Sequence, residues 1–411
     1  MGSNVVIHNP TTPELNAQAV HRKSIITCLV FTASITAITA QPRWYKGNLH
    51  THSYWSDGDE FPEMIMDWYK RHGYHFVGLS DHNTLQEGEK WKRITKSKLR
   101  EDAMHAYLDK YSIYASYRVD SGRYSVRLRT LQEYRLLFED PNFLIVKSEE
   151  ITSRFGDKHI HVNATNIQTV IGAQQGKNVA EVMQNAVTAV IDQRKSTGMP
   201  MFPHVNHPNF YYSITLDDMI ALKGEQFFEV YNGHPLVNNY GDSLRPGMEE
   251  LWDRINLAYY SRNQPLMYGL ATDDSHNYHE FGSSFSNAGR GWVMVRSNSL
   301  TPDALIAAME AGDFYASTGV VLEDVSFSGN VLEIRIKPEP GVAYKIEFVG
   351  VRRGKAKAEV LKSLNGISAQ LNVTTSYRFV RARITSSKLK ANPFQEGDME
   401  MAWTQPVIGK R

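Results

Sequence analysis

The pattern of hydrophobic and polar positions predicts strands that alternate with helices through most of the chain. Short apolar runs rich in β-branched and aromatic residues predict strands at 46–53, 76–83, 143–152, 159–166, 200–208, 226–233 and 266–276. Apolar positions with helical spacing predict helices at 62–73, 178–198, 215–223 and 248–264. Such alternation is typical of parallel βαβ units, so we expect an α/β fold over residues 41–319.

Two segments depart from this alternation. Residues 85–141 are long, charged and partly helical, with a basic cluster at 90–100 (KWKRITKSKLR). We interpret them either as a solvated helical insertion or as a lid or basic rim over the active face. After about residue 320 the pattern changes to period two, as in YKIEFVGVRR, with no long helix. This change predicts a small antiparallel β-domain over 320–411.

Residues 1–40 have the pattern of an export signal. His21, Arg22 and Lys23 precede an apolar run at 24–40 that ends in the small residues AITA. The run is short and rich in Thr and Ser for a membrane span, although an ordinary buried helix is an alternative. We expect a periplasmic or secreted protein with no stable membrane insertion after cleavage near Ala40. Cleavage there would remove Cys28, the only cysteine.

The amino-acid composition argues against some classes of partner but does not by itself indicate a function. The chain has 411 residues, 42% of them hydrophobic and 22% charged, which is the balance of a globular protein with a large core. The formal net charge is only +1, so no overall field favours nucleic acid or an anionic membrane as a partner. The placement of the 15 histidines is more informative.

Histidines and carboxylates recur at the ends of the predicted strands. His50 and His52 are two residues apart, share one strand face and can hold one metal ion, and Asp57 follows in a turn at Gly58. The later candidates are His82, Glu149, Glu150, His159, His161, His204, His207, Asp273, Asp274 and His276. Because the carboxyl ends of the strands in a β/α barrel form one face, we expect these residues to build one metal site.

Adjacent carboxylates on a strand point to opposite faces, so only one of Glu149 and Glu150 can reach such a site, and we favour Glu150. A carboxylate there can offer one oxygen to each of two metal ions. Glu229 ends a further strand and is either a supporting residue or an ordinary polar strand end.

The order HTH, SDG, DHN, EEI, HIHVN, NHP and DxH between Gly47 and His276 resembles the PHP (polymerase and histidinol phosphatase) family of metal-dependent phosphoesterases. The resemblance implies a distorted, TIM-like (β/α)7 barrel with two or three divalent metal ions. It implies one ion on His50, His52, Glu150 and Asp274, a second on Glu150, His161 and His207, and a third on Asp57, His82 and His276. His159 in place of His161, and His204 in place of His207, stay open, as does occupancy of the third site. The C-terminal β-domain more loosely resembles an extension seen in exported members.

Imidazole and carboxylate ligands without thiolates suit Zn, Mn or Fe. Paired metals lower the pKa of a bridging water, and the resulting hydroxide can attack phosphorus in a small-molecule phosphate ester. Arg154, Lys158 and Arg290 are candidates for a cationic clamp on the non-bridging oxygens. His207 or His276 could lie near the leaving group, and no separate general acid is assigned.

Two other functions remain open. The first is a carboxylic or carbamate ester or amide hydrolase on the same cluster, because amidohydrolase-like barrels also begin with HxH and end with Asp. The SDG, DHN and DxH motifs favour the phosphoesterase. The second is a non-catalytic protein with structural metals and a recognition role for the β-domain. A role beside a DNA polymerase is disfavoured, because the chain has no polymerase region and carries an export pattern.

Overall fold

A computed structural model describes residues 41–410, so the predicted signal peptide lies outside the described residues. The described helices are α1 (Pro62–Arg71), α2 (Lys98–Tyr111), α3 (Leu131–Phe138), α4 (Val179–Thr197), α5 (Leu216–Ala221), α6 (Met248–Ser261) and α7 (Pro302–Glu310). No helix within 41–410 has the length and hydropathy needed to cross a membrane.

The strands up to residue 320 are β1 (Arg43–Asn48), β2 (Phe76–Leu79), β3 (Trp91–Arg93), β4 (Tyr117–Asp120), β5 (Arg123–Arg127), β6 (Leu144–Phe155), β7 (Lys158–Thr165), β8 (Phe202–Val205), β9 (Phe227–Asn232), β10 (Tyr268–Thr272), β11 (Trp292–Ser297) and β12 (Phe314–Ser317). The later strands are β13 (Leu322–Ser328), β14 (Val331–Ile336), β15 (Tyr344–Arg352), β16 (Glu359–Asn365), β17 (Ser368–Asn372), β18 (Tyr377–Leu389) and β19 (Met399–Thr404).

One large sheet dominates the fold, with the strand order β10-β9-β8-β7-β6-β2-β1-β11-β12-β19-β18-β15-β16. The α/β prediction is confirmed, but the structure does not show the distorted, TIM-like (β/α)7 barrel, because the sheet is not closed and β10 is its terminal strand. The reason lies in β1, whose residues Arg43–Gly47 pair with β11 on the side that would have to accept β10. Just after these two strands, the backbone forms an isolated parallel bridge between Thr51 and Ser275.

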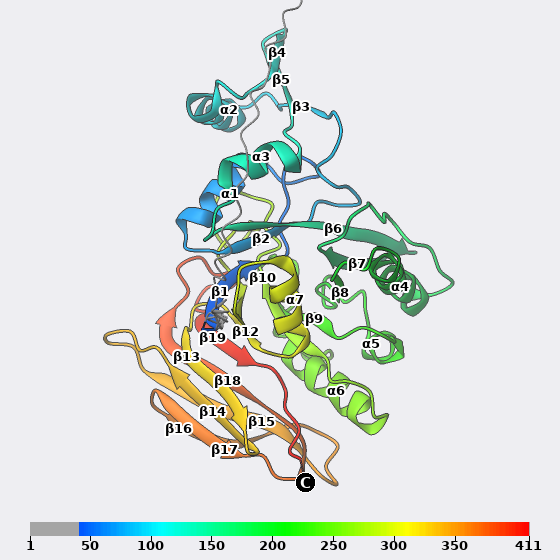
Figure 1. Cartoon of the computed structure of the whole chain (residues 1–411), viewed down its shortest axis with the longest axis vertical. Helices are drawn as coiled ribbons and strands as arrows, with labels where there is room; N and C mark the ends of the chain where they lie inside the picture. The colour runs from blue at the N-terminus through cyan, green and yellow to red at the C-terminus, as the bar shows by residue number, and fades with distance from the viewer. Residues whose placement is uncertain (1–40, 411) are drawn as a thin grey trace, which may run out of the picture. The chain divides into compact units, whose positions relative to one another are not determined.

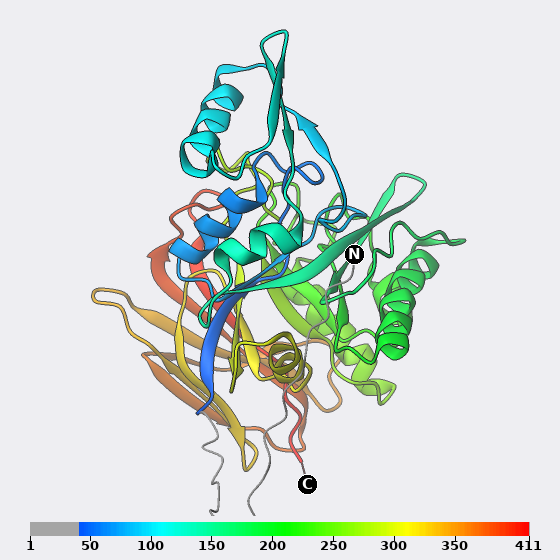
Figure 2. The same ribbon diagram turned by 45° about the horizontal axis from the view of Figure 1, so that its top comes forward.

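The predicted run of parallel strands is interrupted once. β1, β2 and β6 are parallel, and so are β8, β9 and β10, but β7 is antiparallel to both of its neighbours. β6 pairs with β2 only up to Lys147, and from Ser148 onward it forms a hairpin with β7. Figure 2 shows β6 as a long strand that extends into this hairpin. The hairpin places the first residues of β7 beside the carboxyl ends of the parallel strands.

The helices that cover this sheet follow recognisable end signals. In α4, the Asn178 side chain accepts a hydrogen bond from the backbone N–H of Glu181, and Gly198 ends the helix in a left-handed conformation at φ 69°. In α1, Pro62 occupies the first turn, where a missing N–H costs nothing. The buried face of α1, which includes Ile65 and Met66, packs into a cluster of apolar side chains beside β2. These helices fix the strand ends that carry the histidines.

The segment 85–141 folds as α2, α3 and a three-stranded sheet of order β3-β5-β4, which Figure 1 shows together above β2. Its side chains Met104, Tyr107 and Val126 belong to the same apolar cluster as α1. Its basic residues contact the loop after β1: the Arg100 guanidinium lies 2.9 Å from the Asp59 carboxylate. The segment is therefore packed into the fold.

The chain after residue 320 forms antiparallel strands in two groups. β13, β14 and β17 make a separate sheet, whereas β15, β16, β18 and β19 extend the large sheet through the pairing of β12 with β19. Inward-facing residues of both groups, such as Ile334 and Phe348, share one apolar cluster. The period-two pattern thus corresponds to alternation between a buried and an exposed face.

Candidate metal centre

The ends of four strands and one hairpin bring the candidate ligands to one place. His50 and His52 follow β1, His82 follows β2, His207 follows β8, and Asp274 and His276 follow β10. Glu150 and His161 lie inside the β6–β7 hairpin, where Glu150 pairs with Asn163. Because β7 is antiparallel, a residue near its start reaches the edge at which the parallel strands end.

Four residues form the innermost group. The His50 Nε2 atom lies 3.2 Å from Asp274 Oδ1 and 3.3 Å from Glu150 Oε1. The His52 Nε2 atom lies 3.3 Å from Asp274 Oδ1 and 3.5 Å from Glu150 Oε2. All four side chains are buried. The structure therefore brings together the four residues that the resemblance implies for the first ion.

A second group shares Glu150. The His161 Nδ1 atom lies 2.9 Å from Glu150 Oε1, and the His207 Nε2 atom lies 3.6 Å from the same oxygen. The two alternatives left open by the sequence have other nearest polar neighbours, although His159 lines the same pocket and His204 forms a further candidate metal group with His50 and Glu229. His159 Nε2 lies 3.1 Å from Arg154 Nη2, and His204 Nε2 lies 3.6 Å from Glu229. The geometry favours His161 and His207 for this position.

A third group lies at the mouth. Asp57 Oδ1 is 3.3 Å from His82 Nε2 and 3.4 Å from His276 Nε2. His276 Nδ1 is 2.9 Å from the Asp274 carbonyl oxygen, which fixes the ring with Nε2 toward Asp57. The Asp57 side chain is 59% exposed, so this group is the one open to solvent.

Two of these residues have unusual backbone conformations. Asp274 has φ 50° and His207 has φ 25°, in the left-handed region that costs a non-glycine residue about 1–3 kcal/mol. Backbone hydrogen bonds hold both: the Asp274 N–H donates to the His50 carbonyl at 3.0 Å, and the His207 N–H donates to Glu229 at 2.9 Å. Strain of this kind is concentrated at functional sites.

The charges of the centre suit cation binding. Burial opposes ionisation of Glu150, yet the charges of His161, His82 and His50 hold the pKa of Glu150 well below its usual range. Asp274 behaves in the same way, and His50 is the main cause of its lowered pKa. Burial, together with His276 and His82, lowers the pKa of His52 to about 4. The ionised carboxylates and the neutral His52 imidazole have the protonation states that metal ligands need. Burial opposes protonation of His50, but Asp274, Glu229 and Glu150 raise its pKa well above the usual range, so a bound metal ion would have to displace that proton.

The residues fit a divalent ion on a further observation. Nε2 of His50 and both ring nitrogens of His52 are buried and have no hydrogen-bond partner among residues 41–410. Buried polar atoms are nearly always paired, so three orphaned nitrogens beside two carboxylates mark a place for a cation. Nitrogen and oxygen donors without sulfur are consistent with Zn, Mn or Fe.

Glu229 lies directly behind this cluster. Its Oε1 atom is 2.7 Å from His50 Nδ1, so it orients that ring with Nε2 toward Glu150 and Asp274. Its Oε2 atom accepts from Asn232 Nδ2 at 2.8 Å, and the same amide donates to Asp274 at 3.1 Å. Of the two interpretations given by the sequence, the contacts favour the supporting residue.

The neighbouring carboxylates serve the backbone. Glu149 accepts the N–H groups of Ile171 and Gly172 at 2.8 and 2.7 Å. Asp273 accepts those of Arg290 and Gly291 at 2.6 and 2.9 Å. The structure thus separates each adjacent pair, with Glu150 and Asp274 in the cluster and their neighbours holding loops.

The cluster forms one wall of a pocket of about 400 Å³. Among the three clamp candidates, Arg154 lines this pocket, and Lys158 lies outside it, near Asp157. Arg290 as a clamp is wrong: its guanidinium is buried and donates to backbone carbonyls, including those of Gly233 and Phe285.

The sequence-based prediction missed three residues of the pocket wall, Thr152, Phe210 and His234. His234 stands in the motif NGHP just after the strand predicted at 226–233, the position that marked the other histidines. No residue of the 85–141 insertion lines the pocket, so the proposed basic rim is not seen there.

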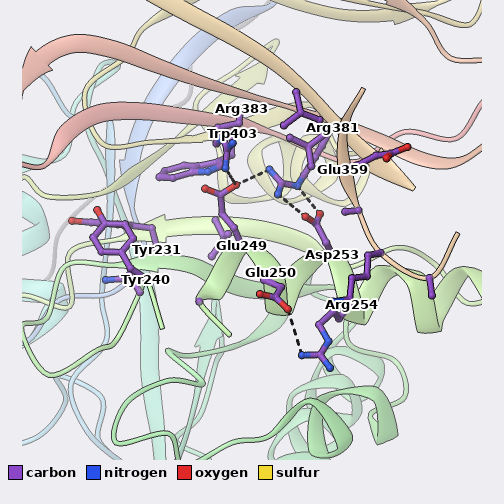
Figure 3. A pocket seen from close by; sticks show the side chains of 18 residues that line it. Tyr231, Tyr240, Glu249, Glu250, Asp253, Arg254, Glu359, Arg381, Arg383 and Trp403 are labelled. Carbon is purple, nitrogen blue, oxygen red and sulfur yellow. Dashed lines mark hydrogen bonds and ion pairs between the residues drawn. The ribbon is translucent and has the colours of Figure 1, made fainter. Parts of the chain in front are cut away.

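A second cavity of about 620 Å³ lies between α6 and the strands β15, β16, β18 and β19 (Figure 3). Its charged floor is paired internally: Arg381 makes hydrogen bonds of 2.8 and 2.9 Å to Asp253 and an ion pair of 3.0 Å to Glu249. Figure 3 shows these groups pointing toward one another. None of the histidine and carboxylate clusters found within 41–410 belongs to this cavity.

No family model and no curated protein matches the chain. It is similar to solved structures. A two-domain protein from Bacteroides vulgatus, described as containing a predicted PHP-like metal-dependent phosphoesterase, is 14% identical, with 89% of this chain and 96% of that chain covered and a TM-score of 0.38.

A structure from Bifidobacterium adolescentis whose description places it among metal-dependent phosphoesterases is 12% identical, with 58% of this chain and 91% of that chain covered and a TM-score of 0.27. An amidohydrolase from Chromobacterium violaceum is 12% identical, with 59% and 90% covered and a TM-score of 0.26. The first of the three carries the description of the family that the motifs resemble. Because all three likenesses are distant, function has to be inferred from the residues of the site.

Proposed function

We propose that the protein is a metal-dependent phosphoesterase that hydrolyses a phosphate ester of a small molecule. One observation carries this proposal: imidazoles and carboxylates from four strand ends and the β6–β7 hairpin gather around Glu150 and Asp274 at a pocket wall, with buried nitrogens that lack any other partner. A structural metal site is normally closed, whereas this cluster opens into a pocket of about 400 Å³ that can hold a substrate.

The residues that would hold the first ion are His50, His52, Glu150 and Asp274. Each imidazole Nε2 atom lies 3.2–3.5 Å from an oxygen of each carboxylate. His161 and His207 would hold a second ion with Glu150, and Asp57, His82 and His276 a third. Bound divalent ions would supply Lewis acidity and make water nucleophilic near neutral pH.

The chain's own groups have separable tasks. Glu229 and Asn232 keep His50 and Asp274 in position, so that the cluster is organised before substrate arrives. Arg154 lies on the pocket wall and offers a positive charge to an anionic group. The ring of Phe210 lies with its centroid 5.0 Å from that of His207 and gives that side of the pocket an apolar surface.

An amide or carboxylic ester hydrolase is the alternative for the same cluster. Amidohydrolase-like sites normally carry a bridging lysine or carboxylate in mid-barrel, and among the described residues no lysine lines the metal pocket. The bridging position here belongs to the carboxylate of Glu150, which fits either class, so the distinction rests on the additional group at the mouth, where Asp57 lies beside His82 and His276. These contacts favour the phosphoesterase.

The test is a substrate panel on the full chain purified with added Mn²⁺ or Zn²⁺. It should contain a phosphomonoester, a phosphodiester and a carboxylic ester with the same 4-nitrophenyl leaving group. We expect turnover of a phosphate ester that is abolished by a chelator and restored by metal. Turnover of the carboxylic ester alone would contradict the proposal.

A further inference from the structure

His234 is a pocket residue that belongs to none of the candidate metal groups. It follows β9 in the loop that returns to α6, and its ring lies between those of Phe210 and His276, with centroid distances of 5.5 and 5.6 Å. The ring is half-buried, and one side of it faces the pocket. Because His234 lines the pocket but belongs to no candidate metal group, we look for a role other than metal binding.

The hydrogen bonds of the loop fix the tautomer of this ring. The Leu236 backbone N–H donates to His234 Nδ1 at 3.1 Å, so Nδ1 is an acceptor and the proton of the neutral ring is on Nε2. The His234 backbone N–H donates to Asn232 Oδ1 at 2.8 Å, and Asn232 in turn bonds Asp274. The ring is therefore tied to the residues that hold the metal cluster.

The Nε2–H group of His234 has no hydrogen-bond acceptor among residues 41–410. The ring is neutral in this arrangement, because Nδ1 accepts the Leu236 N–H and therefore carries no proton of its own. A neutral N–H group without a protein acceptor, on a ring that lines the pocket, is available as a donor to a ligand.

We propose that His234 contacts the substrate, donating the Nε2–H to a non-bridging oxygen of the bound phosphate ester without giving up the proton. This role rests on the proposed function. Coordination of a metal by Nε2 would require the proton to move to Nδ1, which would break the hydrogen bond from Leu236. A neutral imidazole is also too weak an acid to protonate a leaving group, so the ring acts as a fixed dipole for developing negative charge.

The proposal gives the pocket two kinds of donor. Arg154 supplies a full charge on a flexible, exposed side chain, whereas His234 supplies an uncharged N–H that the Leu236 and Asn232 contacts hold in place. A fixed neutral donor adds directional selectivity for a tetrahedral oxyanion without repelling the nearby metal ions. His234 would therefore contribute to specificity for phosphoryl groups as well as to rate.

The experiment compares His234→Phe, which keeps an aromatic ring but removes the donor, with His234→Gln, whose side-chain amide can place an N–H near the Nε2 position. His72→Phe is the matched control, because His72 is exposed and packs against Trp68 outside the pocket. Each metal-loaded variant is assayed with 4-nitrophenyl phosphate and with an alkyl phosphate. Inorganic phosphate binding is measured by calorimetry, and bound metal by elemental analysis.

We expect His234→Phe to lower kcat/KM about 10- to 100-fold for both esters and to weaken phosphate binding, with unchanged metal content, and His234→Gln to recover most of the loss. A loss confined to the alkyl phosphate would identify a general acid, and a missing metal ion would identify a ligand; either result overturns the proposal, as would unchanged kinetics. If the wild-type protein turns over no phosphate ester, the proposed function fails, and unchanged phosphate binding by His234→Phe would then overturn this inference separately.

Discussion

Replacing Glu229 by Gln should weaken metal binding although Glu229 is not itself placed as a ligand. The carboxylate accepts four hydrogen bonds: Oε1 from His50 Nδ1 and Thr272 Oγ1, each at 2.7 Å, and Oε2 from the His207 N–H at 2.9 Å and Asn232 Nδ2 at 2.8 Å. Gln has the same size but only one acceptor oxygen. Whichever way the amide turns, two of the four donors face an NH₂ group.

The expected magnitude follows from these contacts. Loss of a carboxylate that orients a ligating imidazole typically lowers metal affinity about 10- to 100-fold, which corresponds to about 1.4–2.7 kcal/mol. Two buried donors left without acceptors should also lower the free energy of unfolding by about 3 kcal/mol, at about 1.5 kcal/mol each. Burial opposes ionisation, but His50 and His204 hold the pKa of Glu229 well below its usual range, so the group removed is a charged one.

The matched control is Glu225→Gln. Glu225 is also buried, but it accepts hydrogen bonds only from the backbone N–H groups of Gln226 and Phe227. Burial raises its pKa well above the usual range, so its carboxyl group is uncharged, like the amide that replaces it. The affinity of the first ion is measured by competition with a chromogenic chelator. Glu229→Gln with wild-type affinity, or an equal loss in Glu225→Gln, would refute the role assigned to Glu229.

Three further predictions concern stability and processing. Burial raises the pKa of Glu63 to about 7, so the stability that the protonated carboxyl contributes is fully present below pH 4.5 and is lost as the pH rises through 7. In Glu63→Gln, the free energy of unfolding in urea should therefore fall by about 3 kcal/mol less between pH 5 and pH 8 than in the wild-type protein. An equal change in the unfolding free energy at both pH values would contradict this prediction. Arg381→Met leaves Asp253 and Glu249 without their buried cation and should cost about 3–5 kcal/mol, whereas a wild-type Tm would show that the ion pair adds nothing. Export with cleavage near Ala40 predicts a mature N-terminus close to residue 41 by N-terminal sequencing, and an uncleaved leader would exclude it.

The alternation of strands and helices could be predicted from the sequence because each strand is an apolar run and each helix has a distinct apolar stripe. The antiparallel direction of β7 could not, because the pattern in HIHVNATN is the same for either direction. The sequence also could not show that the sheet stays open, because this depends on the pairing of β1 with β11, about 250 residues apart in the chain. Local patterns define elements, and long-range pairing decides their arrangement.

The same distinction applies to the site. Strand-end position was enough to select the residues that converge on Glu150, because the carboxyl ends of parallel strands share an edge. It could not show that Arg290 is used up by backbone carbonyls, that Glu229 supports His50, or that His234 presents a free Nε2–H. Each of these depends on the side-chain rotamer and on loops that fold back from distant positions.

The most direct test of the metal centre is elemental analysis of the full chain after purification and metal loading, beside His52→Ala and Glu150→Gln. Wild-type protein should hold at least two divalent ions per chain, since Glu150 is shared between two groups of ligands. Both variants should lose bound metal and hydrolytic activity while remaining folded by circular dichroism. Wild-type metal content in both variants, or no metal in the wild-type protein, would contradict a metal centre built on these residues.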